Sequence, residues 1–200
     1  ELRAIGGRMG FGVDVVEPVE VALTDHTLVT ASSSIVRWLL VHGRVADAAI
    51  VLGRPYELAG PVVPGDRRGR TIGFPTANLR PEQTPPGPGV YACAAILADG
   101  RTLPAPVHVG ERPSFGDGDH RVEAHILGLP TSCGDGTGLG GPRASREDWA
   151  PIEGLAETGW RCRLRFAGRL RDAIPFRSLD ALARQLATDC RRTEERMSEE

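Results

Sequence analysis

The segment WRCRLRFAGRL, residues 160–170, alternates arginine with apolar side chains along most of its length. A period of two is typical of a β-strand that buries one face and exposes the other. Further stretches upstream combine β-forming residues with Gly or Pro: YELAGPVV at 56–63, GVYACAAILA at 89–98, TLPAPVHVG at 102–110 and RVEAHIL at 121–127. The pattern predicts a mainly β domain built from several short antiparallel strands.

The connections between these strands favour a barrel. They are turns rather than helices, so no β–α–β alternation supports a doubly wound sheet. The final stretch SLDALARQLATDCRRTEERM, residues 178–197, repeats its apolar side chains with a helical period instead. We expect Ser178 to cap this C-terminal helix. The apolar stripe expected to close the barrel consists of Leu179, Leu182, Leu186 and Cys190.

The N-terminal quarter of the chain has a different pattern. Residues 11–30 alternate like short strands, and two short helices are predicted after them. The serines at 32–34 can cap the first helix, and Gly53 suits the end of the second. We therefore place a domain boundary near Gly53, with an N-terminal segment at 1–52 and a barrel domain at 53–200.

Residues 128–159 show no sustained period and are rich in glycine. We expect a flexible insertion in the barrel domain. It contains GTGLGG at 136–141, which formally matches G-x-G-x-x-G. No strand pattern precedes this motif and no helix pattern follows it, so it does not predict a dinucleotide site.

The overall composition argues against several classes of protein. The 24 basic and 26 acidic residues give a formal net charge of −2, so we expect neither a nucleic-acid partner nor a membrane. The four cysteines are scattered, with no C-x-x-C pair and no histidine cluster of zinc spacing. Reduced thiols in a cytoplasmic protein are therefore expected. No pattern indicates an oligomeric state.

The segment GDRRGRTIGFPTAN, residues 65–78, carries groups that suit a phosphate: Gly65, Gly69, Arg70 and Gly73. Thr76 and Asn78 follow two positions apart, so in an extended chain their oxygen atoms face the same side. Such oxygens suit Mg²⁺ bound to nucleotide phosphates. The alternative is a glycine-rich turn in which Thr76 and Asn78 bond to nearby backbone. The segment by itself leaves both interpretations open.

Glu123 stands in the alternating segment RVEAHIL. If its side of the strand faces into a small barrel, the carboxylate is desolvated and suits a general base. Alternatively it is an exposed residue on the outer side of the strand. His125 is either a partner of Glu123 or a structural histidine.

Taken together, five segments resemble bacterial riboflavin kinases, specifically the C-terminal module of the bifunctional riboflavin kinase/FAD synthetase family. They are GDRRGRTIGFPTANL, GVYACAAI, VHVGERPSFG, RVEAHIL and RLRDAIPFRSLDALARQLATD, in the family's order. The similarity covers roughly residues 53–127 and 160–192. The combination of GFPTAN with VEAHI at this distance is the most specific part of it.

The resemblance implies a six-stranded Greek-key barrel with a C-terminal α-helix. It implies transfer of the γ-phosphate of ATP to the ribityl 5′-hydroxyl of riboflavin, giving FMN and ADP. By position, Thr76 and Asn78 would bind Mg²⁺ and the ATP phosphates, and the loop from Gly65 to Gly73 would cover the nucleotide. Glu123 would take the hydroxyl proton. The alternative is a catalytically impaired barrel that binds flavin or nucleotide for regulation.

The N-terminal segment resembles the end of an α/β nucleotidyltransferase, the FMN adenylyltransferase module of the same family. That module has a Ser-Ser-Thr-x-Ile-Arg motif that contacts ATP, and this chain has SSSIVR at 32–37. Its H-x-G-H motif is absent from the chain, so FMN adenylylation by this chain alone is not expected. Two further departures concern the barrel, where His108 replaces an asparagine of the family and 128–159 replaces a short acidic turn.

Overall fold

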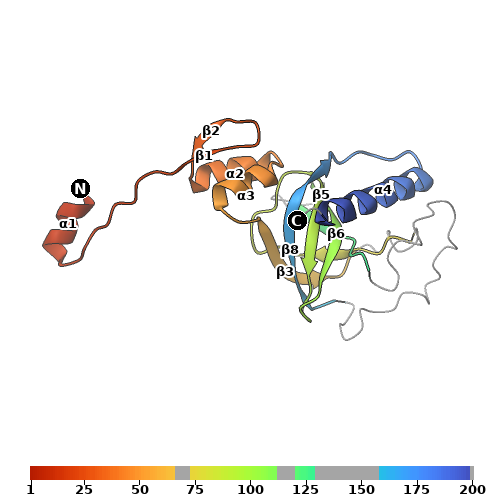
Figure 1. The fold of residues 1–200 in the computed structure, drawn as a ribbon. Helices are drawn as coiled ribbons and strands as arrows, with labels where there is room; N and C mark the ends of the chain where they lie inside the picture. Colours follow the sequence, from red (N-terminus) through yellow and green to blue (C-terminus); the bar gives the residue numbers. More distant parts are fainter. Residues whose placement is uncertain (66–72, 112–119, 129–157, 199–200) are drawn as a thin grey trace.

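The computed structural model describes residues 1–65, 73–111, 120–128 and 158–198 (Figure 1). Its helices are α1 (Leu2–Met9), α2 (Ser33–Val41), α3 (Val45–Leu52) and α4 (Leu179–Ser198). Its strands are β1 (Glu20–Ala22), β2 (Leu28–Thr30), β3 (Glu57–Val63), β4 (Ala77–Leu79), β5 (Gly89–Ile96), β6 (Thr102–Glu111), β7 (His120–Ala124) and β8 (Arg161–Arg171). Most of the predicted insertion, 129–157, lies outside the described residues.

Six strands form a closed antiparallel barrel in the order β3-β4-β7-β6-β5-β8. The strands β5, β6 and β7 are consecutive neighbours, and β8 returns to lie beside β5, which is a Greek-key arrangement. The barrel closes where β3 pairs with β8, with Glu57 opposite Arg165 and Leu58 opposite Leu164. The predicted mainly β fold, with a six-stranded barrel and a C-terminal helix, is confirmed.

The inside of the barrel is filled by alternate residues of its strands. On β8 the core takes Cys162, Leu164 and Phe166, which are at most 4% exposed, while the arginines between them face solvent. This is the alternation that the sequence predicts for the strand. The other strands contribute Leu58, Val62, Leu79, Tyr91, Cys93, Val107, Val109, Val122 and Ala124 to the same cluster.

Helix α4 covers the outer side of β5 and β6 (Figure 1). Ala92 and Ala94, which alternate with the core residues of β5, are themselves buried, and their small side chains let the helix approach closely. Ser178 caps the helix as predicted, because its Oγ accepts a hydrogen bond from the Ala181 N–H at 3.2 Å. The expectation for Leu179 is wrong: it is 63% exposed, so packing against the barrel begins after the first turn.

A buried ion pair holds α4 against the end of β8. The guanidinium of Arg171 donates to both carboxylate oxygens of Asp189, at distances from 2.6 to 3.1 Å. Asp189 is fully buried, and Gln185 also donates to it at 2.9 Å. A bidentate pair of this kind fixes both direction and position.

The N-terminal residues add a helical hairpin and an extended arm. Side chains of α2 and α3, including Leu39, Leu40, Val45 and Ala48, belong to the same core cluster as the barrel. The expectation of strands over 11–30 holds only for β1 and β2, which pair with each other. Residues 11–19 form no strand, and α1, which was not predicted, lies at the far end of this arm (Figure 1).

Candidate active site

Two of the segments singled out in the sequence lie side by side because β4 and β7 are neighbours in the barrel. Asn78 on β4 is the direct cross-strand partner of Glu123 on β7. On the other side of β7, Glu123 is paired with His108 of β6. Directly opposite residues carry their side chains on the same face, with Cβ atoms about 5 Å apart. The register therefore gathers an amide, a carboxylate and an imidazole into one row.

This row lies on the outer face of the barrel, so of the two orientations that the sequence left open for Glu123 the structure shows the outward one. Its neighbours Val122 and Ala124 are each 1% exposed and pack in the core, and strand alternation turns Glu123 the other way. Its side chain is 24% exposed, and the Arg121 Nε lies 2.8 Å from its Oε1. The carboxylate thus forms a close ion pair with an arginine, while part of it stays exposed.

Gly65 packs directly against Asn78. A Cβ built at position 65 would overlap the Asn78 amide, so any side chain there would push the amide away. Gly73, at the other end of the loop, has φ +82°, a conformation that favours glycine. Gly69 and Arg70 lie outside the described residues. Local structure therefore explains why glycine occupies both described ends of the loop.

Thr76 and Asn78 flank Ala77, whose side chain packs against the core cluster. Their own side chains are therefore directed away from the core, and both are half-buried. Within the described part of the chain, neither the Thr76 hydroxyl nor the Asn78 amide is engaged in a side-chain hydrogen bond. This favours the ligand-binding interpretation of the segment over a turn stabilised by local bonds.

The donor set fits a hard cation that is brought in by a nucleotide. A hydroxyl and an amide carbonyl are oxygen donors of the kind that Mg²⁺ or Ca²⁺ accept, and Mg²⁺ is usually held by few protein ligands together with substrate phosphates. Among the described residues there is no group of three or more His, Cys, Asp or Glu side chains that could hold a metal ion.

His108 is the third member of the row. Its Nδ1 lies 3.9 Å from the Glu123 Oε2, and its side chain is 43% exposed. Gly110 makes room for it, since a Cβ there would come 2.8 Å from the His108 Cε1. Burial lowers the pKa of His108 below its usual 6.5; Glu123 acts in the opposite direction, while Arg171 and Arg121 lower it further. The imidazole is therefore neutral at pH 7.

His125 lies next to this row but does not contact Glu123. Its Nδ1 is 2.7 Å from the backbone oxygen of Pro75, and its ring meets Phe74 edge to face at 5.3 Å between centroids. Of the two roles that the sequence left open, the structure shows the structural histidine: the side chain is 2% exposed and bonds to the turn before Thr76. The signal in the sequence was its place two residues after Glu123.

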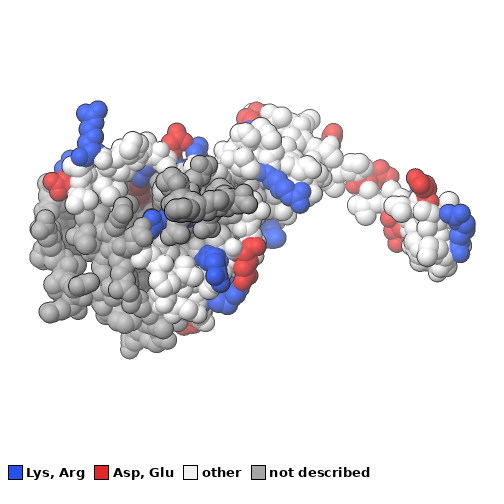
Figure 2. All heavy atoms as spheres, turned by 180° about the vertical axis from the view of Figure 1, so that it is seen from behind, with Lys and Arg blue, Asp and Glu red and all other residues white. Residues whose placement is uncertain are grey.

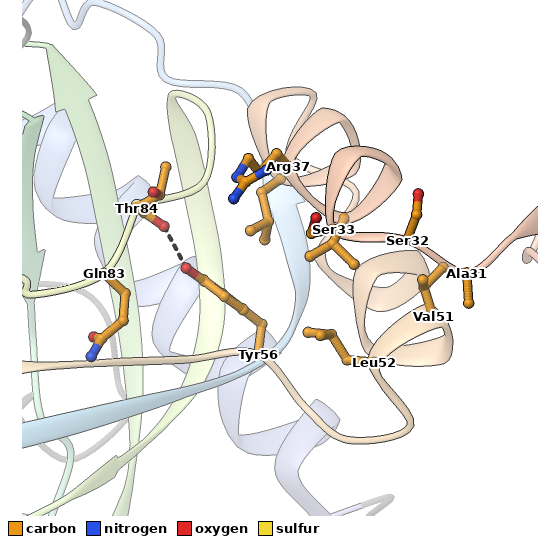
Figure 3. A pocket seen from close by; sticks show the side chains of 11 residues that line it. Ala31, Ser32, Ser33, Arg37, Val51, Leu52, Tyr56, Gln83 and Thr84 are labelled. Atoms are coloured by element: carbon orange, nitrogen blue, oxygen red, sulfur yellow. Dashed lines mark hydrogen bonds between the residues drawn. The ribbon is translucent and has the colours of Figure 1, made fainter. Parts of the chain in front are cut away.

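A hollow of about 590 Å³ lies where α2 and α3 meet the barrel (Figure 3). Ser32, Ser33 and Arg37 of the SSSIVR motif line one side, and Tyr56 and Thr84 line the other. Tyr56 Oη donates to the Thr84 carbonyl at 2.6 Å. The Ser32 Oγ accepts from the Ile35 N–H at 3.3 Å and caps α2. The motif therefore has a structural role at the start of this helix.

The described surface shows no single sign of charge on the face seen in Figure 2, where arginine and acidic side chains are interspersed among uncharged ones. None of the described helices is both long and apolar enough to cross a membrane.

The riboflavin kinase (flavokinase) family profile matches residues 52–197. The chain belongs to the riboflavin kinase family. The match includes the whole barrel and most of α4, and it includes Thr76, Asn78 and Glu123. The resemblance stated for the five sequence segments is confirmed.

Several bifunctional riboflavin kinase/FMN adenylyltransferases are similar to this chain. That of Escherichia coli K12 is 42% identical over 50% of this chain and 32% of its own length. That of Bacillus subtilis is 44% identical, over 42% of this chain and 27% of its own length. That of Pseudomonas fluorescens is 34% identical, over 63% of this chain and 39% of its own length. The matches thus span about a third of the length of these relatives.

Among solved structures, a macrolide-efflux protein from Streptococcus pneumoniae superposes with a TM-score of 0.71. It is 28% identical, and the superposition covers 95% of this chain and 53% of that chain. The similarity therefore extends over the N-terminal hairpin as well as the barrel.

Proposed function

We propose that this chain is a riboflavin kinase, which transfers the γ-phosphate of ATP to the 5′-hydroxyl of riboflavin and releases FMN and ADP. The observation that carries the proposal is the direct pairing of Asn78 with Glu123. It puts an oxygen donor for a metal–nucleotide complex beside a carboxylate that is accessible to the second substrate. Membership of the riboflavin kinase family supports the choice of riboflavin.

Glu123 is proposed to accept the hydroxyl proton as the phosphoryl group arrives. A neutral hydroxyl is a poor nucleophile, and a carboxylate within hydrogen-bond reach removes its proton in the transition state. The Arg121 Nε, 2.8 Å from the carboxylate, favours its ionised form. Phosphoryl transfer otherwise depends mostly on positioning of the two substrates.

Thr76 and Asn78 are proposed to bind a divalent metal together with the ATP phosphates, and Mg²⁺ is the ion that best suits this donor set. When bound, the metal neutralises charge on the phosphates. The protein would hold the two oxygen atoms at fixed positions. Ala77 contributes by packing into the core, and Gly65 by leaving space for the Asn78 amide. The loop from Gly65 to Gly73, with Gly69 and Arg70, is proposed to cover the phosphates.

The domain division belongs to the same proposal. Residues 53–200 would form the kinase barrel, and 1–52 the end of an adenylyltransferase-like module. We do not propose FMN adenylylation for this chain alone, because it lacks an H-x-G-H motif. The free, buried thiols of Cys93 and Cys162 support a cytoplasmic location.

The test is an assay of purified protein with riboflavin, ATP and Mg²⁺, in which FMN is separated and quantified. We expect FMN in proportion to ADP, and no FMN when the metal is removed with a chelator. Protein that binds riboflavin and ATP without forming FMN would instead support the alternative of an impaired, regulatory barrel.

A further inference from the structure

One hydrogen bond joins the segment that carries Glu123 to the turn that carries Thr76. The His125 Nδ1 lies 2.7 Å from the backbone oxygen of Pro75. Since a carbonyl oxygen only accepts, Nδ1 must carry the proton. His125 stands two residues after Glu123, and Pro75 immediately precedes Thr76. The bond therefore links the segment next to Glu123 to the segment next to Thr76, the two residues that are proposed to act in the same phosphoryl transfer.

Strand pairing does not extend far enough to do this. The pairing of β4 with β7 begins at Ala77 opposite Ala124, so it positions Asn78 but not Pro75 or Thr76. His125 directly follows β7, and its side chain forms the next link between the two segments, to Pro75. Its backbone N–H donates to the Pro106 carbonyl at 3.0 Å, which fixes the residue itself against β6.

Packing alone does not explain a histidine at this place. The side chain is 2% exposed, and it adjoins the apolar cluster of Phe74, Leu127 and Cys190 through the Phe74 ring. Its Nε2 has no hydrogen-bond partner within the described part of the chain. A buried polar atom without a partner is unfavourable, and a leucine or methionine would fill the space without it. The bond from Nδ1 to Pro75 is what the histidine adds.

We propose that His125 is a positioning residue, which fixes the Thr76 hydroxyl relative to the Glu123 carboxylate through its hydrogen bond to Pro75. The inference rests on the proposed function, because it assigns the metal–nucleotide complex to Thr76. It predicts that loss of the bond lowers the affinity for the metal–nucleotide complex but not the affinity for riboflavin.

Two amide variants separate the bond from the bulk of the ring. In His125→Asn the amide nitrogen takes the place of Nδ1, whereas in His125→Gln it takes the place of Nε2 and the side chain is larger. Binding of Mg²⁺ with a non-hydrolysable ATP analogue is measured by calorimetry, and kcat and KM are measured for both substrates. Leu127→Ala, in the same apolar cluster, is the control for loss of packing.

We expect His125→Gln to weaken binding of the Mg²⁺–analogue complex and to raise the KM for ATP by about tenfold, the size of one buried hydrogen bond. His125→Asn should stay within about threefold of wild type, and Leu127→Ala should lower the melting temperature without this change. Equal effects of Asn and Gln, or an effect that follows side-chain volume, would overturn the inference. Wild-type protein that does not bind the Mg²⁺–analogue complex would overturn the proposed function itself.

Discussion

Two regions of this molecule carry residues that suit a nucleotide, and they are built differently. In the candidate row, Asn78, Glu123 and His108 come from three strands and are brought together by register. In the hollow between α2 and the barrel, the motif residues Ser32, Ser33 and Arg37 all come from one helix and its cap. Facing them are Tyr56, Gln83 and Thr84 (Figure 3).

The difference shows what turns a motif into a site. The row holds groups with distinct chemistry, namely an amide, a carboxylate and an imidazole, and the barrel fixes their spacing. Across the hollow, the Tyr56 hydroxyl donates a hydrogen bond to the Thr84 carbonyl, so it has a structural role. We therefore expect substitutions in the row to affect turnover strongly and substitutions in the hollow to leave the kinase reaction unchanged.

The largest effect is expected for Glu123→Gln. Glutamine keeps the shape and can still contact Arg121, but it cannot accept the hydroxyl proton. General-base catalysis contributes about 10²- to 10⁴-fold, so kcat should fall at least about a hundredfold with little change in the affinity for ATP and riboflavin. Steady-state kinetics of FMN formation measure this.

Glu57→Gln is the matched control for that substitution. Glu57 also lies on the outside of the barrel and accepts from an arginine, Arg165, at 2.8 Å, but it is on β3, outside the row. Its kcat should equal that of the wild type. If Glu123→Gln also retained near-normal kcat, Glu123 would be an ordinary outward-facing strand residue.

Thr76→Ala should have the next largest effect. Removal of the hydroxyl takes away one oxygen donor, so we expect the KM for ATP at fixed Mg²⁺ to rise about tenfold and kcat to fall as well. Thr76→Ser retains the oxygen and should restore most of the activity. An alanine variant that responds to Mg²⁺ as the wild type does would remove Thr76 from the proposed site.

The pH profile should reveal His108. Because burial lowers its pKa below 6.5, the imidazolium forms only as the pH falls below that value. The charge then stands 3.9 Å from Glu123 and makes the carboxylate a weaker base. The groups that face His108 are Glu123, Arg121 and Arg171. Below pH 6.5, kcat/KM of the wild type should fall about two- to fivefold more than that of His108→Asn, as expected for a partly solvated charge pair. Coincident profiles would contradict this.

The smallest effect is expected in the hollow. Arg37→Ala should leave FMN formation unchanged within error, because Arg37 lines the hollow from α2 (Figure 3), whereas the row is built from β4, β6 and β7. A large loss of kcat at unchanged melting temperature would mean that the hollow and the row work together.

The sequence predicted those parts of the fold that local pattern determines. The alternation of β8, the caps of α2 and α4 and the C-terminal helix are all found in the structure. Residues 11–19 alternate as well, but alternation makes a strand only where a partner strand is available, and the sequence does not show this. Leu179 has the right helical phase, but its turn lies beyond the packed cluster.

The candidate site was predicted in its residues but not in its geometry. The segment around Glu123 predicts a strand, but not which face is inside. That is decided by Val122 and Ala124 reaching the core. The contact of His125 with Pro75 joins positions 50 residues apart, so no local pattern could indicate it. The roles of Thr76, Asn78 and Glu123 remain predictions.

Among the described residues, β4 has the fewest cross-strand pairs of the six barrel strands. It pairs with β3 at two positions and with β7 at three, whereas β5 pairs with β6 at eight. A strand with so few ladder bonds opens more readily than its neighbours, and the backbone amides it exposes exchange with solvent sooner. We therefore expect the strand that carries Asn78 to open most readily within the described part of the barrel. A nucleotide bound beside Asn78 would stabilise β4 against local opening. It would therefore slow hydrogen exchange in β4 more than in the other barrel strands.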